Sequence, residues 1–246
     1  MIHVGTSGWS YQPWRGDFYP RGTTDELGHL AQRVNTVEVN STFYGPRKPA
    51  DYDRWYSAVP DDFVFAVKAP RDITHSRRLR DVATPISDFF SSGVLSLGRK
   101  LGPILWQLPA SLRYSPSLMA DFLPLLPTSV QHALEVRHPS YYDDTFIDQL
   151  TTHSVALVIA DSPGTWPSLL AHTSTFTYLR LHGDTELYTS PYSDPALDEW
   201  ASRIRSLHTH GDVYTYFDNT LSGAAPRDAI RLAERLADPQ RADDPR

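Results

Sequence analysis

The chain of 246 residues contains no cysteine. This absence excludes disulfide bonds, thiolate nucleophiles and zinc or iron–sulfur centres held by cysteine ligands. Nowhere are there about 18 consecutive apolar residues, the length that a membrane-spanning helix needs. The first residues lack the basic stretch and long apolar core of a secretion signal. We therefore expect a cytoplasmic protein with no membrane span.

Positive charge is also scarce. Lys and Arg number 23 against 29 Asp and Glu, which gives a formal net charge of -6. A protein that coats nucleic acid or anionic membrane with its whole surface needs a broad excess of basic residues, so that class is disfavoured. The apolar content of 40% suffices for a large core, and this length is usual for one α/β barrel. We expect a single domain over 1–246, with a polar tail that frays from about 238.

The chain alternates short apolar runs with segments of helical character. The runs lie at 2–7, 35–42, 63–69, 103–108, 132–137, 155–160, 176–182 and 212–218. The segments 24–33, 49–58, 84–100, 116–126, 143–153, 194–209 and 227–236 favour helices. This alternation predicts an α/β fold, a single (β/α)8 TIM-type barrel. One crossover, at 161–175, is interrupted by Pro163, Gly164 and Pro167 and is expected to be degenerate.

Charged or amide side chains gather where nearly every apolar run ends. Strands that bury both faces normally read as continuous Val, Ile and Leu, so these polar ends need an explanation. In a closed parallel barrel the ends meet at the C-terminal mouth, where barrel enzymes have their active sites. The candidates at these ends are Glu38, Asn40, Lys68, Gln107, Glu135, Arg137, His138, Asp161, Arg180, His182, Asp218 and Asn219.

Strand geometry groups some of these candidates on one face. Side chains alternate along a strand, so Glu38 points the same way as Asn40, and Arg180 the same way as His182. If that direction is the barrel interior, the charges converge. Acids and amines can transfer protons, whereas arginine, histidine and amide groups bind substrate and balance charge. The candidate catalytic residues are Glu38, Lys68, Glu135, Asp161 and Asp218.

Two other interpretations use the same residues. A structural ion-pair network inside the barrel would contain them too, because buried charges must pair wherever they occur. Glu38, Glu135, Asp161 and His182 could instead ligate a divalent metal. No tight ligand spacing requires that metal, and the nearby basic side chains would compete for the carboxylates. The identity of any cofactor stays open.

Two loops add substrate-binding candidates. The loop after the first strand is rich in aromatic residues, among them Trp9, Tyr11 and Trp14, and Tyr44 follows the second strand. Such rings either stack on a sugar or nucleobase or pack against the barrel. The segment 71–80, which contains His75 and four arginines, concentrates positive charge. It is either a phosphate-binding loop or a solvated basic turn.

Several strings resemble a family known as domain of unknown function seventy-two, whose members are described as sugar-isomerase-related. The strings are Gly5–Tyr11, Phe18–Pro20, Val37–Tyr44, Phe65–Lys68, Ile73–His75, Lys100–Pro109, Glu135–His138 and Tyr178–Gly183. The resemblance implies a TIM-type barrel but supplies no reaction. The chain departs from the family pattern at Tyr141, where Trp is usual, and at 216–219, where Tyr-Phe-Asp-Asn stands for a Phe-Asn-Asn run. The second departure alters one carboxyl or amide of the mouth, at Asp218.

These observations favour an enzyme that acts on a small polar, anionic or sugar-like substrate at the barrel mouth, by acid/base chemistry that hydrolyses or isomerises it. A second hypothesis is a protein that engages a nucleic-acid strand end or flipped base, using the basic loop and the aromatic loop. A third is a non-catalytic ligand-binding or assembly protein. The sequence does not specify an oligomeric state.

Overall fold

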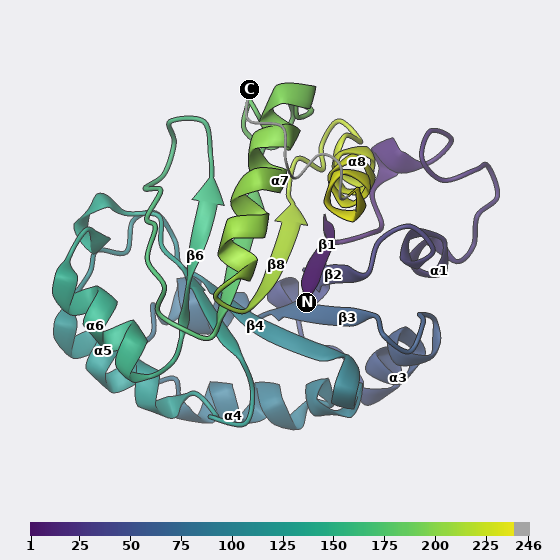
Figure 1. The fold of residues 1–246 in the computed structure, drawn as a ribbon. Coiled ribbons are helices and arrows are strands. Elements are labelled where there is room, and N and C mark those ends of the chain that lie inside the picture. The colour runs from purple at the N-terminus through teal and green to yellow at the C-terminus, as the bar shows by residue number, and fades with distance from the viewer. Residues whose placement is uncertain (239–246) are drawn as a thin grey trace.

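The eight apolar runs form the strands of a closed, all-parallel barrel in the computed structural model, which describes residues 1–238 (Figure 1). The strands are β1 Ile2–Ser7, β2 Thr36–Val39, β3 Val64–Lys68, β4 Leu101–Gln107, β5 His132–Glu135, β6 Ala156–Asp161, β7 Phe176–Leu181 and β8 Asp212–Phe217. Each strand pairs with its neighbours in sequence, and β8 closes the barrel against β1. The predicted (β/α)8 TIM-type fold is confirmed.

Helices surround the barrel, as Figure 1 shows. They are α1 Glu26–Ala31, α2 Ser41–Tyr44, α3 Pro49–Ser57, α4 Ala83–Ser91, α5 Pro116–Phe122, α6 Asp144–Thr152, α7 Asp194–His208 and α8 Ala225–Ala237. Proline stands in the first turn of α3, α5, α7 and α8, where its missing N–H costs no helical hydrogen bond. Ser193 caps α7 by accepting a hydrogen bond from the Ala196 N–H.

Alternate residues of the strands fill the barrel interior. A buried cluster combines large rings, such as Phe176, Tyr178 and Tyr216, with small side chains such as Ala66 and Ala133. Because strand side chains alternate, the residues two positions further along these strands also point inward, at the C-terminal mouth. The other strand face packs against the helices and forms the larger apolar core.

One glycine sets how closely two strands approach. A Cβ atom built on Gly5 of β1 would lie 1.9 Å from the carbonyl oxygen of Thr36 in β2. No side chain fits at that distance, so glycine is required there.

Local differences from the predicted elements have backbone causes. The predicted strand 35–42 ends at Val39, because Asn40 adopts helical angles and α2 follows. The predicted helix 84–100 is divided: α4 ends at Ser91, Gly93 has a φ of 111°, and a short helix, η3 Val94–Lys100, follows. A further π-helical turn, η2 Asp72–Ser76, was not predicted. Residues 162–175 contain neither helix nor strand, which confirms the degenerate crossover.

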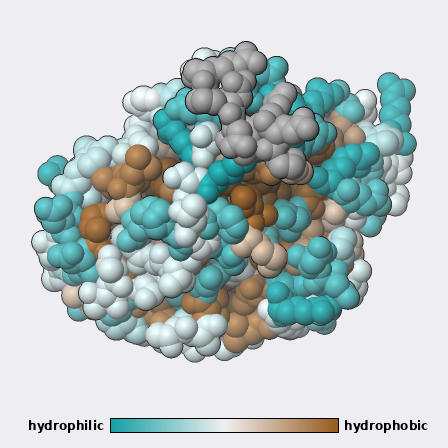
Figure 2. All heavy atoms as spheres, viewed as in Figure 1, coloured by the Kyte–Doolittle hydropathy of each residue, from teal (hydrophilic) through white to brown (hydrophobic). Residues whose placement is uncertain are grey.

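The expected fraying from about 238 falls on 239–246 and lies outside the described residues. Within residues 1–238, no helix is both long enough and apolar enough to span a membrane. On the face shown in Figure 2, hydrophobic residues are interspersed with hydrophilic ones, so that face offers no continuous apolar surface.

Candidate active site

Arg180, at the inner face of β7, joins three carboxylates at the barrel mouth. Its guanidinium is 1% exposed. It donates hydrogen bonds to both oxygens of Glu38, at 3.1 and 2.9 Å, and to Glu135 at 2.7 Å. A further bond of 3.0 Å reaches Asp218, which follows β8. One arginine therefore connects strands from three sides of the barrel.

Glu38 is fully buried and its oxygens are saturated. Besides the guanidinium of Arg180, the Ser7 hydroxyl donates to it at 2.6 Å and the Tyr178 hydroxyl at 2.7 Å. The amide of Asn40 in turn donates to the Ser7 hydroxyl at 2.7 Å. Sequence reasoning missed Ser7 and Tyr178 as members of this network. The alternation of side chains along a strand would have pointed to Tyr178, since it lies two residues before Arg180 on the same strand face.

Arg137 extends the network towards two loops. Its Nε donates to Glu135 at 2.6 Å, and Nη1 donates to the Tyr188 hydroxyl at 3.2 Å. The guanidinium carbon lies 3.6 Å from the ring centroid of Trp166. Trp166 belongs to the degenerate crossover and Tyr188 to the loop after β7. These two rings, which the sequence did not single out, therefore cover one side of the mouth.

His182 forms the link to Asp218. Its Nδ1 lies 3.0 Å from the same Asp218 oxygen that Arg180 contacts. Its Nε2 is buried and has no hydrogen-bond partner among the described residues. The rings of Trp166 and Tyr188 lie against the imidazole edge to face. The histidine is thus fixed in orientation, with one ring nitrogen unused.

The electrostatic environment keeps two of the acids ionised. Burial alone would raise the pKa of the Glu135 carboxyl, but Arg137 and Arg180 hold it below its ordinary value. Burial would also raise the pKa of the Asp218 carboxyl, but Arg180 and the hydrogen bond with His182 outweigh burial and lower this pKa. Neither acid can donate a proton near neutral pH.

Lys68 behaves differently from the rest of the cluster. It ends β3 and is only 8% exposed, yet its ammonium makes no hydrogen bond or ion pair with any described residue. The Nζ atom lies 4.3 Å from the ring centroid of Phe43. Burial and the repulsion of Arg180 lower the pKa of Lys68 to about 8, against the attraction of Glu38, Asp218 and Glu135. Lys68 is therefore a group whose protonation can change near physiological pH.

His75 lies in a positive corner of the mouth. Burial, together with the charges of Lys68, Arg71 and Arg137, lowers its pKa to about 4. His75 is thus neutral at physiological pH. The three cations that repel its proton define a place where an anion would be attracted.

The structure does not bring Asp161 into the cluster. It accepts hydrogen bonds from Tyr192 at 2.7 Å and from Trp200 of α7 at 3.1 Å. The inward positions of β6 belong to Ala156 and Val158, so Asp161 points to the helical layer. Burial raises its pKa despite these two donors.

Four other candidates make hydrogen bonds to residues outside the cluster. Asn219 donates to Asp228 of α8 and to the Ser190 carbonyl. Trp14 is fully buried and donates to the Thr220 carbonyl. His138 caps the turn Pro139–Tyr141 through the Ser140 N–H. Gln107 is buried and its amide donates to the Leu108 carbonyl.

The remaining aromatic candidates line the rim. Trp9, Tyr11, Asn40 and Tyr44 contribute to a cavity of about 760 Å³ beside the mouth. The Tyr11 hydroxyl donates to the Ser7 carbonyl at 2.6 Å, which ties this cavity to the network around Glu38. Tyr44 is 79% exposed. A substrate in the mouth would meet these side chains first.

The donor set does not resemble a metal site. No group of three or more His, Cys, Asp or Glu side chains suited to a metal ion occurs within residues 1–238. The carboxylates that could have served as ligands are already paired with Arg180 and Arg137. The arrangement instead suits proton transfer by Lys68 beside fixed charges, and binding of an anionic group near His75.

Comparison with known proteins gives a family but no reaction. A family model described as "Protein of unknown function DUF72" matches residues 3–246. The UPF0759 protein YecE of Escherichia coli strain K12 is 32% identical over 66% of this chain, and the match covers about 60% of its own length. The UPF0759 protein YunF of Bacillus subtilis strain 168 is 24% identical over 96% of this chain and 95% of its own. The crystal structure of a DUF72 family protein from Thermotoga maritima superposes with a TM-score of 0.86 at 24% identity, covering 97% of this chain and all of the other.

Proposed function

This chain belongs to the DUF72 family of proteins of unknown function, and we propose that it is an enzyme acting on a small polar, anionic or sugar-like substrate by acid/base chemistry at the barrel mouth. The reaction we propose is a hydrolysis or an isomerisation. Both reactions need a group that gives or takes a proton and fixed charges that stabilise the developing one.

The observation that carries the proposal is the state of Lys68. A lysine confined to structure either reaches solvent or pairs its ammonium, because a buried unpaired charge is costly. Lys68 is largely buried and its ammonium has no hydrogen bond or ion pair among residues 1–238, and its pKa of about 8 places both protonation states within reach near neutral pH. Perturbed groups of this kind cluster at functional sites. We assign the general acid/base role to Lys68.

The charges around Lys68 favour an anionic substrate. Lys68, Arg71, Arg137 and Arg180 face three carboxylates, Glu38, Glu135 and Asp218, so four positive charges stand against three negative ones. The Arg180 guanidinium donates hydrogen bonds to all three acids. The surplus positive charge therefore lies on the Lys68 side, where a carboxylate or phosphate of the substrate would be held.

The carboxylates then have a supporting role in the mechanism. Their ionised state fixes Arg180 and tempers the repulsion that it exerts on Lys68. Lys68, when protonated, donates to an oxygen that gains negative charge; when neutral, it removes a proton from the substrate. Asn40 and Tyr44 lie at the rim, where they would orient the uncharged part of the substrate.

The test is proton exchange and turnover on a panel of anionic sugars. Aldose phosphates, ketose phosphates, uronates and glycosides are incubated with the protein in deuterated buffer and followed by nuclear magnetic resonance. Isomerisation would incorporate deuterium beside the carbonyl, and hydrolysis would release the leaving group. We expect Lys68→Met to lower kcat by about 100-fold or more, and Lys48→Met, at an exposed lysine, to match the parent.

The pH profile provides the second readout. Activity of the parent should change with an inflection near the pKa of Lys68, and this inflection should be missing from Lys68→Met. Circular dichroism melts of both variants exclude unfolding as the cause. Equal turnover in the Lys68→Met variant and the parent would refute the role of Lys68, and capture of a compound with no product would favour a binding protein.

A further inference from the structure

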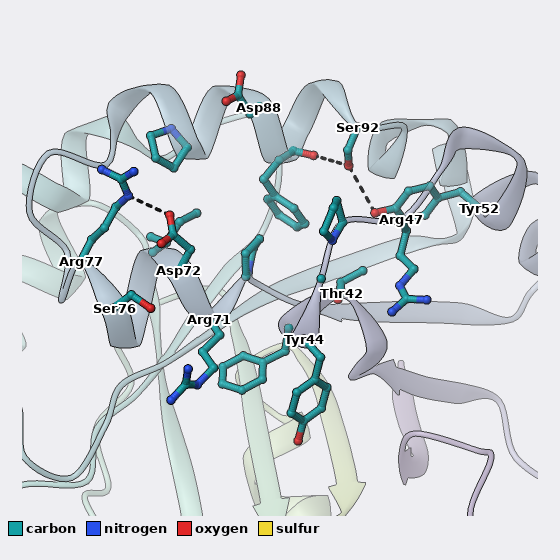
Figure 3. Close-up of a pocket in the computed structure, with 17 residues that line it drawn as sticks. Thr42, Tyr44, Arg47, Tyr52, Arg71, Asp72, Ser76, Arg77, Asp88 and Ser92 are labelled. Carbon is teal, nitrogen blue, oxygen red and sulfur yellow. Dashed lines mark hydrogen bonds and ion pairs between the residues drawn. The ribbon is translucent and has the colours of Figure 1, made fainter.

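A second cavity lies next to the mouth, outside the strands. It is bounded by α2, the π-helical turn η2 and α4, and its volume is about 550 Å³ (Figure 3). Phe43, Ile73 and Phe89 give it apolar walls, and three arginines with Tyr44 stand at its edges. This volume and this mixture of apolar walls with a few polar groups are typical of a small-molecule site.

The three arginines of the cavity differ in how many of their N–H donors are already hydrogen-bonded. Arg77 is paired with Asp72 at 2.7 Å. Arg47 donates one bond to the Ser41 carbonyl, and its Nε is buried without a partner among the described residues. Arg71 makes no hydrogen bond or ion pair within residues 1–238. The unused donors of the cavity therefore belong to Arg47 and Arg71.

These unused donors lie on one side. In Figure 3 the side chains of Arg71, Tyr44 and Arg47 all extend away from α4, with Tyr44 between the two arginines. The Arg77–Asp72 pair lies between Arg71 and α4 in this view, and Asp88 points away from the cavity. Arg71 also adds to the positive field that lowers the pKa of His75. An anion at Arg71 would thus meet no unpaired carboxylate of the cavity wall.

Tyr44 completes the pattern. Its ring is 79% exposed and meets Phe43 edge to face, with 5.1 Å between the ring centroids. An exposed ring with a guanidinium on either side offers a stacking face and N–H donors for a phosphate. Single-stranded nucleic-acid sites combine the same two elements.

We infer that this cavity binds a nucleoside phosphate, with the phosphate at Arg71 and the base against Tyr44. The ligand is either a free mononucleotide or the 5′-phosphorylated end of a single strand, since both present this chemistry. The inference goes beyond the proposed function, because the cavity lies beside Lys68 and its binding does not require proton transfer there.

The test is isothermal titration calorimetry of the intact chain with adenosine monophosphate, adenosine, inorganic phosphate and 5′-phosphorylated hexathymidylate. We expect adenosine monophosphate to bind more tightly than adenosine or phosphate alone. Arg71→Ala and Tyr44→Ala should each raise its Kd by about tenfold.

Matched controls separate the cavity from general charge and from the mouth. Arg80→Ala removes the same charge from the same loop outside the cavity, and Tyr142→Ala removes another exposed tyrosine ring elsewhere. Both should leave Kd within about twofold. Lys68→Met should also keep binding, even where it abolishes turnover. Tighter binding of the hexathymidylate than of the mononucleotide would assign the strand end, and equal binding the free nucleotide.

Two results would overturn the inference. One is the absence of saturable binding of both nucleotide probes to the parent. The other is an equal loss of affinity in Arg80→Ala and Arg71→Ala, which would show that the loop attracts anions only by its total charge. Either result leaves the Lys68 proposal standing, because that proposal is tested by turnover.

Discussion

Replacing Arg180 with methionine should destabilise the protein strongly. The guanidinium is 1% exposed and makes five hydrogen bonds, four to the carboxylates of Glu38, Glu135 and Asp218 and one to Ser7. Removing one partner of a buried ion pair costs about 3–5 kcal/mol, because the other charge remains buried and unpaired. For a chain of this size each kcal/mol lowers Tm by about 2–4 °C, so we expect a fall of about 6–20 °C.

The pH dependence of this loss identifies its cause. In the parent, the pKa values of Glu135 and Asp218 lie below those of the unfolded chain. Their stabilisation is therefore present above the unfolded value, about pH 4, and is lost as the pH falls through the folded values. In Arg180→Met, the two carboxyls stay buried but lose the guanidinium, so both pKa values rise above those of the parent. Protonation at low pH then removes the cost of burying their unpaired charge. The Tm difference should shrink between about pH 7 and about pH 4.

The assay is thermal unfolding followed by circular dichroism across this pH range. Arg203→Met is the control, since Arg203 is exposed on α7, pairs with Glu199 on the surface and otherwise lies 5.2 Å from the Trp200 ring centroid. Its Tm should change by no more than about 2 °C. A similarly small change for Arg180→Met would refute the reasoning, as would a Tm difference that does not vary with pH.

Two further predictions concern single residues. The pKa of Lys68 in the folded protein, about 8, lies below its value in the unfolded chain, so the charged form opposes folding at neutral pH and stability rises as the pH increases from about 8 to about 10. Lys68→Met should therefore raise Tm at pH 7, with a gain of about 1–3 kcal/mol in the free energy of unfolding. In melts at pH 10 this gain should be smaller. A lower Tm of this variant at pH 7 would show that the ammonium has a stabilising partner. Asp161→Asn should keep the turnover of the parent, because Asp161 does not reach the mouth. Its free energy of unfolding in urea should fall by about 1–3 kcal/mol, because Asp161 accepts hydrogen bonds from Tyr192 and Trp200. Loss of turnover without loss of stability would contradict this placement.

The sequence was sufficient for the barrel and for most of its mouth. Alternation of apolar runs with helical segments determines a parallel barrel, and strand ends then have to meet at one side. Parity along a strand correctly grouped Arg180 with His182, which share Asp218 as a partner in the structure. These inferences use only local geometry, which residues a few positions apart reveal directly.

Parity fails where a strand carries no polar residue to mark its inner face. In β6 both faces are apolar, so the sequence does not show whether Ala160 or Asp161 points inward. The structure places Asp161 towards α7, where the Trp200 indole donates to it. Asn219 and Trp14 are similar cases, since their partners, Asp228 and the Thr220 carbonyl, are set by how α8 and the first loop pack. Contacts of this kind depend on tertiary packing.

The structural network and the proposed site are two parts of one arrangement. A purely structural network would pair every buried charge, because an unpaired one costs stability. Glu38, Glu135, Asp218 and Arg180 follow this rule, and both oxygens of Glu38 and of Glu135 are already hydrogen-bonded. Lys68 lies at the same barrel mouth but does not follow the rule that buried charges are paired. The paired residues hold the electric field constant, so Lys68, whose ammonium has no hydrogen bond or ion pair among the described residues, is the place where a reacting group would find a proton.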